Sequence, residues 1–247
     1  MNAHSGAAEA DSPSVILFDL GNVLFSDPWE SLLLTPGAGL GDRLGLDRSA
    51  VLEAGRRCWR TFSVREAEEA EYWHELSRQL GCDISAQLVK ELEEELLVAN
   101  PAAGALLAAA SADGVRPVGI ASNNTSFWYA KQAERLLLDR WIDPGLVFLS
   151  CGLGVSKSTP GRGLLEIAAE HVRPSSTLFV EDREANLARA RGLGFRTVKY
   201  GFEDESGDES SDQSGHESGH ESGHESGHES GGMSGVSAVE LLDTITG

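Results

Sequence analysis

Residues 15–24, which read VILFDLGNVL, constrain the fold of this chain more than any other segment. Four apolar residues lead straight to Asp19, and a Gly-Asn pair follows one residue later. A short apolar run that stops at a turn signal is typical of a buried strand. Open α/β sheets bind their ligands beyond the carboxyl ends of such strands. The segment therefore predicts a strand over residues 15–18 that presents Asp19 at the functional edge of a sheet.

Strand and helix patterns alternate in the part of the chain that follows residue 100. Predicted strands cover residues 15–18, 115–121, 146–150, 177–181 and 195–199. Helical patterns cover residues 102–114, 126–138, 161–172, 184–194 and 235–245. Such alternation with short connections is typical of a parallel sheet that is covered by helices. We therefore predict an α/β fold with a Rossmann-like parallel sheet of about five strands.

Residues 26–100 interrupt this alternation, because they are rich in Leu, Glu, Arg and Ala and show no strand pattern. One helical pattern over 65–81 ends at Gly81, and a second over 84–100 is stopped by Pro101. We predict that 26–100 form a helical cap inserted after the first strand. The α/β core then comprises residues 14–25, 101–200 and 235–247.

Two segments have the composition of disordered chain. Residues 1–13 form a polar tail, and residues 201–234 are rich in Gly, Ser and acids and repeat the tetrapeptide HESG four times. Such segments bury too little apolar surface to offset the entropy lost on ordering. We interpret the repeat as a solvated insertion between the last strand and a terminal helix. The alternative is that its regularly spaced histidines bind Zn²⁺ or Ni²⁺.

Charge and cysteine content narrow the classes of partner. The formal net charge is −19, and ten of the acids fall in residues 201–232. So acidic a chain repels nucleic acids and anionic membranes, and we expect neither as a partner. No apolar run approaches the roughly 20 residues that span a bilayer, and the N-terminus lacks the pattern of a signal peptide. The three cysteines form no CxxC pair, so we expect reduced thiols in a cytoplasmic protein.

Four short polar segments lie just past the ends of predicted strands. They read DLGNV, ASNNT, GVSKSTP and VEDREAN. The carboxyl ends of parallel strands share one edge of the sheet, so these segments can converge. The candidate site residues that they carry are Asp19, Ser122, Asn123, Lys157, Glu181 and Asp182.

These residue types suit phosphoryl transfer. A carboxylate such as Asp19 can attack phosphorus and form an aspartyl-phosphate, which divides one difficult step into two. Carboxylates of Asp19 and Asp182, with Glu181 as a closer or water-mediated third, supply the hard oxygen ligands that Mg²⁺ prefers. These anions and the substrate phosphate repel one another, so the metal and a nearby cation are needed to offset the charge.

The remaining candidates suit the phosphate itself. Ser122 offers a hydroxyl group, and main-chain N–H groups beside Asn123 face a predicted helix start, where anions bind readily. Lys157 supplies a point charge for the phosphate oxygens and for Asp19. The alternatives are that Ser122 and Asn123 cap the helix that begins near Ser126, and that Lys157 is an exposed loop lysine.

The chain resembles the haloacid dehalogenase superfamily of aspartate-nucleophile hydrolases. The resemblance covers residues 14–200 and the terminal helix, and it rests on four motifs in order: FDLGNVL, ASNNT, Lys157 in GVSKSTP, and FVEDREANLARARGLG. It is strongest to the subgroup with a helical cap and the DLGNV first motif, which contains sugar-phosphate phosphatases. The resemblance implies that Asp19 is the nucleophile and that the Gly21 carbonyl joins Asp19 and Asp182 around Mg²⁺.

One residue departs from the family pattern. Most phosphatases of the superfamily carry a second Asp two residues after the nucleophile as a general acid, and Gly21 stands there in this chain. Loss of a general acid slows a reaction by about 10²–10⁴-fold. Asp27, Glu30 and His74 are the candidate replacements.

We predict a Mg²⁺-dependent phosphatase that acts on a small organic phosphate, with a sugar phosphate as one candidate. Two alternatives stay open. A dehalogenase on the same scaffold would need no metal, which makes the Glu181–Asp182 pair count against it. A binding or regulatory relative would have lost its acid at Gly21 and would use the histidine-rich repeat to hold metal.

Overall fold

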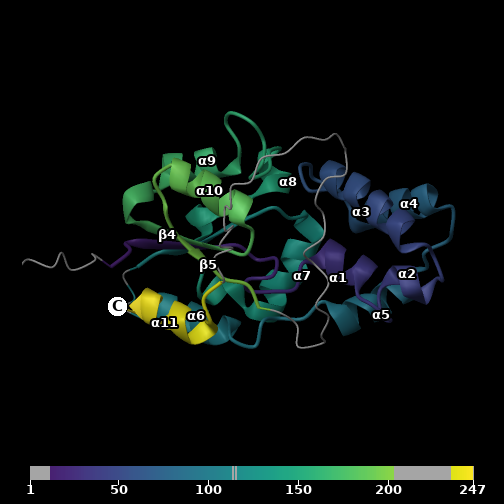
Figure 1. Ribbon diagram of the computed structural model, residues 1–247, viewed down its shortest axis with the longest axis horizontal. Helices are drawn as coiled ribbons and strands as arrows, with labels where there is room; N and C mark the ends of the chain where they lie inside the picture. Colours follow the sequence, from purple (N-terminus) through teal and green to yellow (C-terminus); the bar gives the residue numbers. More distant parts are fainter. Residues whose placement is uncertain (1–11, 113, 115, 203–234, 247) are drawn as a thin grey trace, which may run out of the picture.

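The computed structural model describes residues 12–112, 114, 116–202 and 235–246 (Figure 1). The predictions made for residues 1–11 and 203–234, which include the HESG repeat, lie outside this part. Among the described residues, no helix is long and apolar enough to cross a membrane.

Within the described residues, five strands form one sheet in which every pairing is parallel. They are β1 (Val15–Phe18), β2 (Val118–Ser122), β3 (Val147–Leu149), β4 (Thr177–Glu181) and β5 (Arg196–Lys199). Their order is β3-β2-β1-β4-β5, so the chain reverses direction across the sheet between β1 and β4. Ligands of open α/β sheets bind at such a switch point. The predicted α/β fold with a Rossmann-like parallel sheet is therefore confirmed.

Helices cover both faces of this sheet. They are α6 (Ala103–Ala110), α7 (Ser126–Leu136), α8 (Ser150–Leu153), α9 (Leu164–His171), α10 (Glu184–Gly192) and α11 (Ala238–Thr246), with short 3-10 helices over Leu138–Arg140, Pro144–Leu146 and Pro174–Ser176. Successive side chains of β1 point to opposite faces. Ile16 and Phe18 pack towards α6 and α11, whereas Leu17 packs towards α9 and α10. Figure 1 shows these two pairs of helices on opposite sides of the strands.

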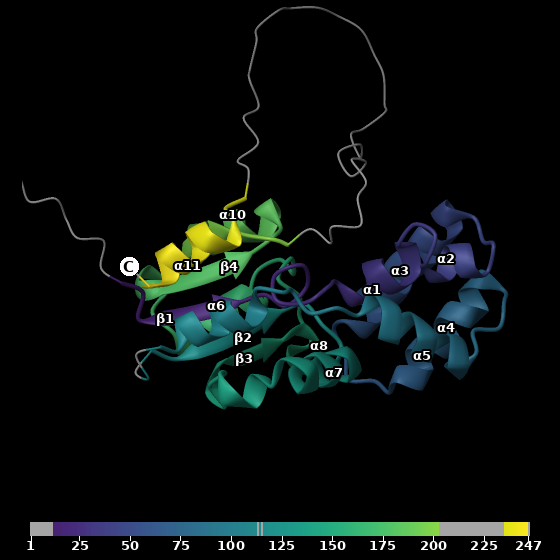
Figure 2. The ribbon, with the colours of Figure 1, turned by 90° about the horizontal axis from the view of Figure 1, so that it is seen from below.

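A block of five helices is inserted between β1 and β2. It comprises α1 (Pro28–Leu34), α2 (Leu40–Arg43), α3 (Arg48–Phe62), α4 (Glu69–Leu80) and α5 (Ala86–Leu96). Gly81 ends α4 in the left-handed conformation, with φ 67°, which a glycine adopts without strain. The block has its own apolar core, and Figure 2 shows it beside the α/β part.

Helix α7 links the two parts. Trp128 is fully buried, and its ring lies 4.9 Å from the ring of Tyr72 between centroids and 6.3 Å from that of Trp73. It therefore belongs to the core of the helical block, although α7 belongs to the α/β part. Both ribbon views place α7 between the sheet and the block (Figures 1 and 2).

The helical pattern over 84–100 extends further than the helix does. α5 ends at Leu96, because the chain that follows pairs with the segment that enters the block. The Ser26 amide donates to the Val98 carbonyl at 2.8 Å, and the Asn100 amide donates to the Leu24 carbonyl at 3.0 Å. These bonds join the two connections between the helical block and the α/β part.

The last helix returns to the sheet. Leu241 and Ile245 of α11 are fully buried in the core that α6 also lines. Before α11, the Val236 amide donates to the Lys199 carbonyl at 3.0 Å, while the Phe202 amide donates to the Asn22 carbonyl at 2.9 Å. The chain therefore leaves β5 and comes back to it at almost the same place.

Candidate active site

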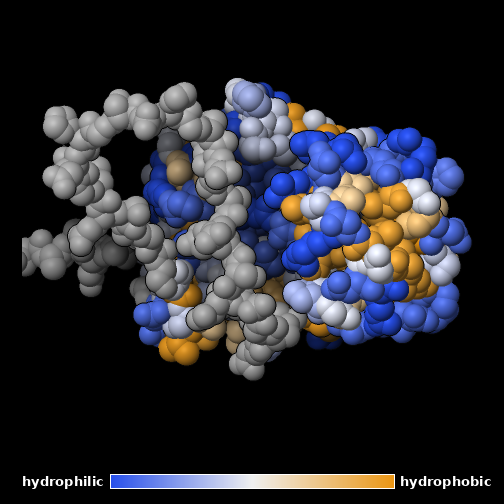
Figure 3. Space-filling view, turned by 45° about the vertical axis from the view of Figure 1, so that its right-hand side comes forward, coloured by the Kyte–Doolittle hydropathy of each residue, from blue (hydrophilic) through white to orange (hydrophobic). Residues whose placement is uncertain are grey.

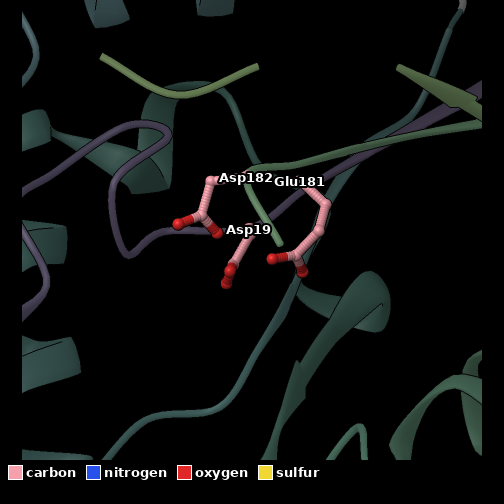
Figure 4. Close-up of side chains that lie close together, drawn as sticks. All are labelled: Asp19, Glu181 and Asp182. Atoms are coloured by element: carbon pink, nitrogen blue, oxygen red, sulfur yellow. The ribbon is translucent and has the colours of Figure 1, made fainter. Parts of the chain in front are cut away.

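Three acidic side chains meet at the carboxyl edge of the sheet. Asp19 directly follows β1, while Glu181 ends β4 and Asp182 follows it, so two adjacent strands present them. One carboxylate oxygen of each lies within 4.8 Å of the others. Figure 4 shows the three carboxylates facing a common space. The sequence-predicted acids are therefore brought together at the switch point of the sheet.

Lys157 lies inside this cluster rather than in an exposed loop. Its side chain is 1 % exposed, and Nζ is 2.8 Å from Asp19 Oδ2 and 2.6 Å from Glu181 Oε2. Burial disfavours the ammonium ion, but the two carboxylates outweigh burial and raise the pKa of Lys157 above its usual value. The Lys157 amide donates to Asn123 Oδ1 at 2.8 Å, which fixes the lysine loop against the end of β2. The alternative of an exposed loop lysine is wrong.

Burial and neighbouring charges act on the Asp19 carboxyl group in opposite directions. Burial, followed by the charge of Glu181, raises its pKa to about 6, while Lys157 and a hydrogen bond from Ser122 act in the opposite direction. Asp19 Oδ1 accepts a hydrogen bond from the Leu20 amide at 2.8 Å. These three donors fix the orientation of the carboxylate at the edge of the sheet, and a carboxylate so held can act as a nucleophile.

The two acids of β4 differ in what they can bind. Glu181 Oε2 contacts Lys157, and Oε1 accepts from the Arg183 amide at 3.1 Å, so protein donors engage both oxygens. Burial raises the pKa of Glu181. Asp182 is half-buried, and its Oδ2 accepts from Asn22 Nδ2 at 3.2 Å. Protein donors also contact both oxygens of Asp19, so Asp182 is the least engaged of the three acids. Carboxylate oxygens are the ligands that Mg²⁺ prefers, and Asp19 and Asp182 could supply them.

These residues open on a cavity of about 230 Å³. The α/β part contributes the following lining residues: Asp19, Gly21, Asn123, Asn124, Lys157, Ser158, Arg183, Ala185 and Asn186. The segment entering the helical block contributes Asp27 and Pro28, and α3 contributes Trp59. In Figure 3 the visible surface between the two parts is hydrophilic, whereas apolar side chains gather on the helical block. The cavity therefore lies where the two parts meet.

The hypothesis that Ser122 and Asn123 cap α7 is wrong. Thr125 caps this helix, because its hydroxyl accepts from the Trp128 amide at 3.4 Å. Ser122 is buried beside Asp19, and Asn123 lines the cavity. Asn123 therefore reaches the cavity, whereas the Ser122 hydroxyl contacts Asp19 and is not among the lining residues. Asn124 is turned away, since its Nδ2 donates to Gln132 Oε1 at 2.7 Å.

The three candidate proton donors occupy different places. His74 is exposed on α4 and lines a separate groove of about 880 Å³ between α4 and α5. Glu30 is partly exposed and lies 3.1 Å from Arg183 Nη2. Asp27 is buried and lines the cavity of Asp19. Burial and the charge of Glu30 raise the pKa of Asp27 to about 7, against the effect of Arg183.

Three residues of the site were not predicted from the sequence. Asn22 adopts φ 55°, and its side chain bonds both Asp182 and, at 3.1 Å, the Asp27 amide. A Gly-Asn pair after a strand was a usable signal, because Asn tolerates this conformation. Arg183 follows the two acids directly and was overlooked beside them. Trp59 gives no signal in the sequence, since only the packing of α3 brings it to the cavity.

Comparisons with known proteins give matches at the level of structure. No family model matches the chain, and no curated protein matches it by sequence. A HAD-family enzyme from Bacteroides thetaiotaomicron has a TM-score of 0.59 and 16% identity, over 76% of this chain and 93% of that chain. The same enzyme was solved in complex with magnesium and inorganic phosphate, with a TM-score of 0.59 and 18% identity over 77% of this chain and 96% of that one.

Two other solved structures are similar to this chain in fold. A predicted HAD-like family hydrolase from Porphyromonas gingivalis has a TM-score of 0.54 and 25% identity, over 75% of this chain and 90% of that chain. L-2-haloacid dehalogenase from Xanthobacter autotrophicus, with chloropropionic acid covalently bound, has a TM-score of 0.53 and 18% identity, over 76% of this chain and 77% of that chain. The neighbours thus include a dehalogenase and a phosphate-binding enzyme, and they do not test the predicted subgroup. The chain has the fold of the haloacid dehalogenase-like hydrolase superfamily, as its four motifs predict.

Proposed function

We propose that this protein is a Mg²⁺-dependent phosphatase that hydrolyses a small organic phosphate through an aspartyl-phosphate on Asp19. The observation that carries the proposal is the buried Lys157 ammonium, which contacts Asp19 and Glu181 next to a third acid, Asp182. Three carboxylates carry more negative charge than one lysine offsets, and a divalent metal ion bound beside them would balance this excess. A sugar phosphate is one candidate substrate, because the cavity of about 230 Å³ suits a small molecule.

The residues divide the work as follows. Asp19 attacks phosphorus, while Ser122, the amides beside Asn123 and Lys157 hold the phosphoryl oxygens. Glu181 keeps Lys157 charged and in place. When bound by Asp19, Asp182 and the Gly21 carbonyl, Mg²⁺ would neutralise the negative charge shared by nucleophile and substrate. Water then hydrolyses the phospho-aspartate and restores Asp19.

Dehalogenase chemistry is the second candidate, because L-2-haloacid dehalogenase is among the structural neighbours. In that reaction Asp19 would attack carbon, and no metal would be required. The acidic cluster of Asp19, Glu181 and Asp182 favours the phosphatase, since three carboxylates carry more negative charge than Lys157 alone offsets and a divalent metal ion would balance the remainder. The neighbour that binds magnesium and inorganic phosphate supports the same choice.

The test is turnover of p-nitrophenyl phosphate with and without Mg²⁺, followed by a panel of sugar phosphates, nucleotides and phospho-acids. We expect metal-dependent release that vanishes in Asp19→Asn. Release of chloride from 2-chloropropionate without metal would favour the dehalogenase instead. Silence on both assays, with Zn²⁺ or Ni²⁺ binding that is lost on deleting residues 215–231, would favour the binding relative.

A further inference from the structure

Asp27 is a second carboxyl group that faces the cavity of Asp19. It precedes α1 and is 8 % exposed, and it lines the cavity together with Asp19 and Lys157. Its main chain is held by the Asp27 amide, which donates to Asn22 Oδ1 at 3.1 Å, and its side chain by Oδ1, which accepts from the Glu30 amide at 3.5 Å. Asp19 and Asp27 are the two acids among the residues that line this cavity.

The placement of Asp27 suits the leaving group. In phosphoryl transfer the attacking and leaving oxygens lie roughly in line through phosphorus. Asp19 lines the cavity from the α/β part, whereas Asp27, Pro28 and Trp59 line it from the helical block and the segment that enters it, so a phosphate ester bound between the two parts would present its leaving oxygen to these three residues. Asp27 is the residue of this wall that can give up a proton readily.

The space beside Gly21 is filled by the Asp27 side chain. A Cβ atom on Gly21 would lie 3.3 Å from Asp27 Oδ2 and 3.6 Å from Asp27 Cγ. The Asp27 carboxyl group thus occupies the space that a side chain on residue 21 would enter. A larger residue at position 21 would compete with Asp27 for the same part of the cavity.

Arg183 is shared between Asp27 and its neighbour. Arg183 Nη2 lies 3.1 Å from Asp27 Oδ2 and 3.1 Å from Glu30 Oε1. One guanidinium therefore contacts two carboxyl groups. Arg183 also orients the Asp27 carboxyl group within the cavity.

We propose that Asp27 is the general acid of this site and protonates the oxygen of the leaving group. The proposal rests on the phosphatase function proposed above. As the Asp19 oxygen bonds to phosphorus, the ester P–O bond breaks, and its electron pair takes the proton of the Asp27 carboxyl group to give a neutral alcohol. In the second step Asp27, now a carboxylate, accepts a proton from the water that attacks the phospho-aspartate. Phosphate leaves, and both carboxyl groups return to their starting states.

The experiment compares two leaving groups in the variant Asp27→Asn. p-Nitrophenolate leaves without a proton, whereas the more basic phenolate needs one. We expect kcat/KM for phenyl phosphate to fall about 10²-fold, the low end of general-acid catalysis, and kcat/KM for p-nitrophenyl phosphate to fall much less. The ratio of the two values comes from one protein sample, so it does not depend on the fraction that is folded.

Two further variants sharpen the result. Asp47→Asn is the matched control, because Asp47 caps α3 through the Ala50 amide at 2.9 Å and does not line the cavity, so its substitution should leave the ratio unchanged. In the double variant Gly21→Asp with Asp27→Ala, a carboxyl group enters the vacated space, and we expect part of the phenyl phosphate activity to return.

The outcomes separate this proposal from the one that it rests on. An Asp27→Asn variant that slows both substrates equally, or neither, overturns the role of Asp27 while wild-type turnover still supports the phosphatase. Wild-type protein that releases neither phenol in the presence of Mg²⁺ overturns the phosphatase itself. A selective loss with phenyl phosphate supports both.

Discussion

At the scale of single residues, the candidate active site contains buried charged side chains, and burying a charge lowers the stability of the folded state. Asp19, Lys157 and Glu181 are all buried, and taking each charge out of water costs several kcal/mol. Lys157 contacts both carboxylates, so three buried charges share two ion pairs. The negative charge that Lys157 does not offset would favour a bound cation, and in the absence of a cation it lowers the stability of the fold.

We therefore expect Asp19→Asn to stabilise the metal-free protein at neutral pH. The pKa of Asp19 is raised from 3.8 to about 6, so the folded state holds this proton more tightly than the unfolded state. Wild-type stability then falls as pH rises from about 4 to about 6, and the gain in the variant reaches about 3 kcal/mol at pH 7. Denaturant unfolding at a series of pH values, with a chelator present, measures it. A gain that does not shrink below pH 4 would contradict this origin.

Lys157→Met should have the opposite effect. It leaves Asp19 and Glu181 buried without a cation, which typically costs about 3–5 kcal/mol. Urea unfolding measures the loss of stability. Lys90→Met is the matched control, because Lys90 pairs with Glu94 on the surface at 3.7 Å, where such pairs are worth about 0–1 kcal/mol. If Lys157→Met and Lys90→Met lowered the free energy of unfolding equally, Lys157 would not be the cation that compensates Asp19 and Glu181.

At the scale of elements, helix contacts set the shape of the block that covers the cavity. α1 and α3 touch at Gly55, where an added Cβ would lie 2.8 Å from Leu33 Cδ1 and 3.1 Å from Trp29 Cε3. The same α3 carries Trp59, which stacks on Trp29 with ring centroids 6.4 Å apart. The position of Trp59 in the cavity therefore depends on a close helix contact that has no room for a methyl group.

Gly55→Ala should destabilise the protein by about 1–3 kcal/mol, because overpacking outweighs the better helix propensity of alanine. Gly104→Ala in α6 is the matched control. An added Cβ at Gly104 meets nothing within 4 Å, so this substitution should be stabilising by up to about 1 kcal/mol. Thermal unfolding of both variants measures the difference. Two shifts of the same sign would contradict the close contact of α1 and α3.

An ion-pair triad joins the helical block to α7. Lys131 Nζ lies 2.7 Å from Glu69 Oε2 in α4 and 2.6 Å from Glu93 Oε1 in α5. Lys131→Met should lower the free energy of unfolding by about 2 kcal/mol, because Glu93 is buried and loses its cation. Hydrogen exchange should accelerate first in α4 and α5.

The control for this triad is Arg162→Met, which breaks a more exposed pair with Glu170 and should cost less than about 1 kcal/mol. If exchange in α4 and α5 stays unchanged in Lys131→Met, the triad does not hold the helical block.

At the scale of the whole molecule, the residues that flank segment 203–234, which we call the excursion, lie close together. Phe202 bonds Asn22, and Val236 bonds Lys199, so residues on both sides of the excursion lie beside the end of β5. Replacing residues 203–234 by a short Gly-Ser linker should leave the unfolding midpoint almost unchanged, because α11 can still bury Leu241 and Ile245.

Removing residues 203–247 instead should cost several kcal/mol, since each of those two side chains contributes about 1.5–3 kcal/mol of burial. Denaturant unfolding distinguishes the two deletions. A linker variant that is as unstable as the truncated one would show that the excursion itself supports the fold.

The sequence predicted the parts of the molecule that depend on local pattern. Asp19, Glu181 and Asp182 follow apolar runs, and parallel strands bring such ends together, so their convergence could be foreseen. Trp59 could not, because it reaches the cavity through the tertiary packing of α3. The pairing of Glu181 with Lys157 depends on side-chain conformations that no spacing encodes. The early end of α5 depends on Leu24 and Ser26, more than 70 residues earlier in the chain.

The burial of Trp128 in the helical block has a mechanical consequence. Because this indole packs against Tyr72 and Trp73 of α4, any displacement of the block would displace α7 with it. Ser122 ends β2 and Asn123 follows it, three residues before α7, so the same displacement would shift the main-chain amides that we propose as the phosphate site. If the block covers the cavity during a reaction, opening it and releasing the bound anion would follow from one displacement.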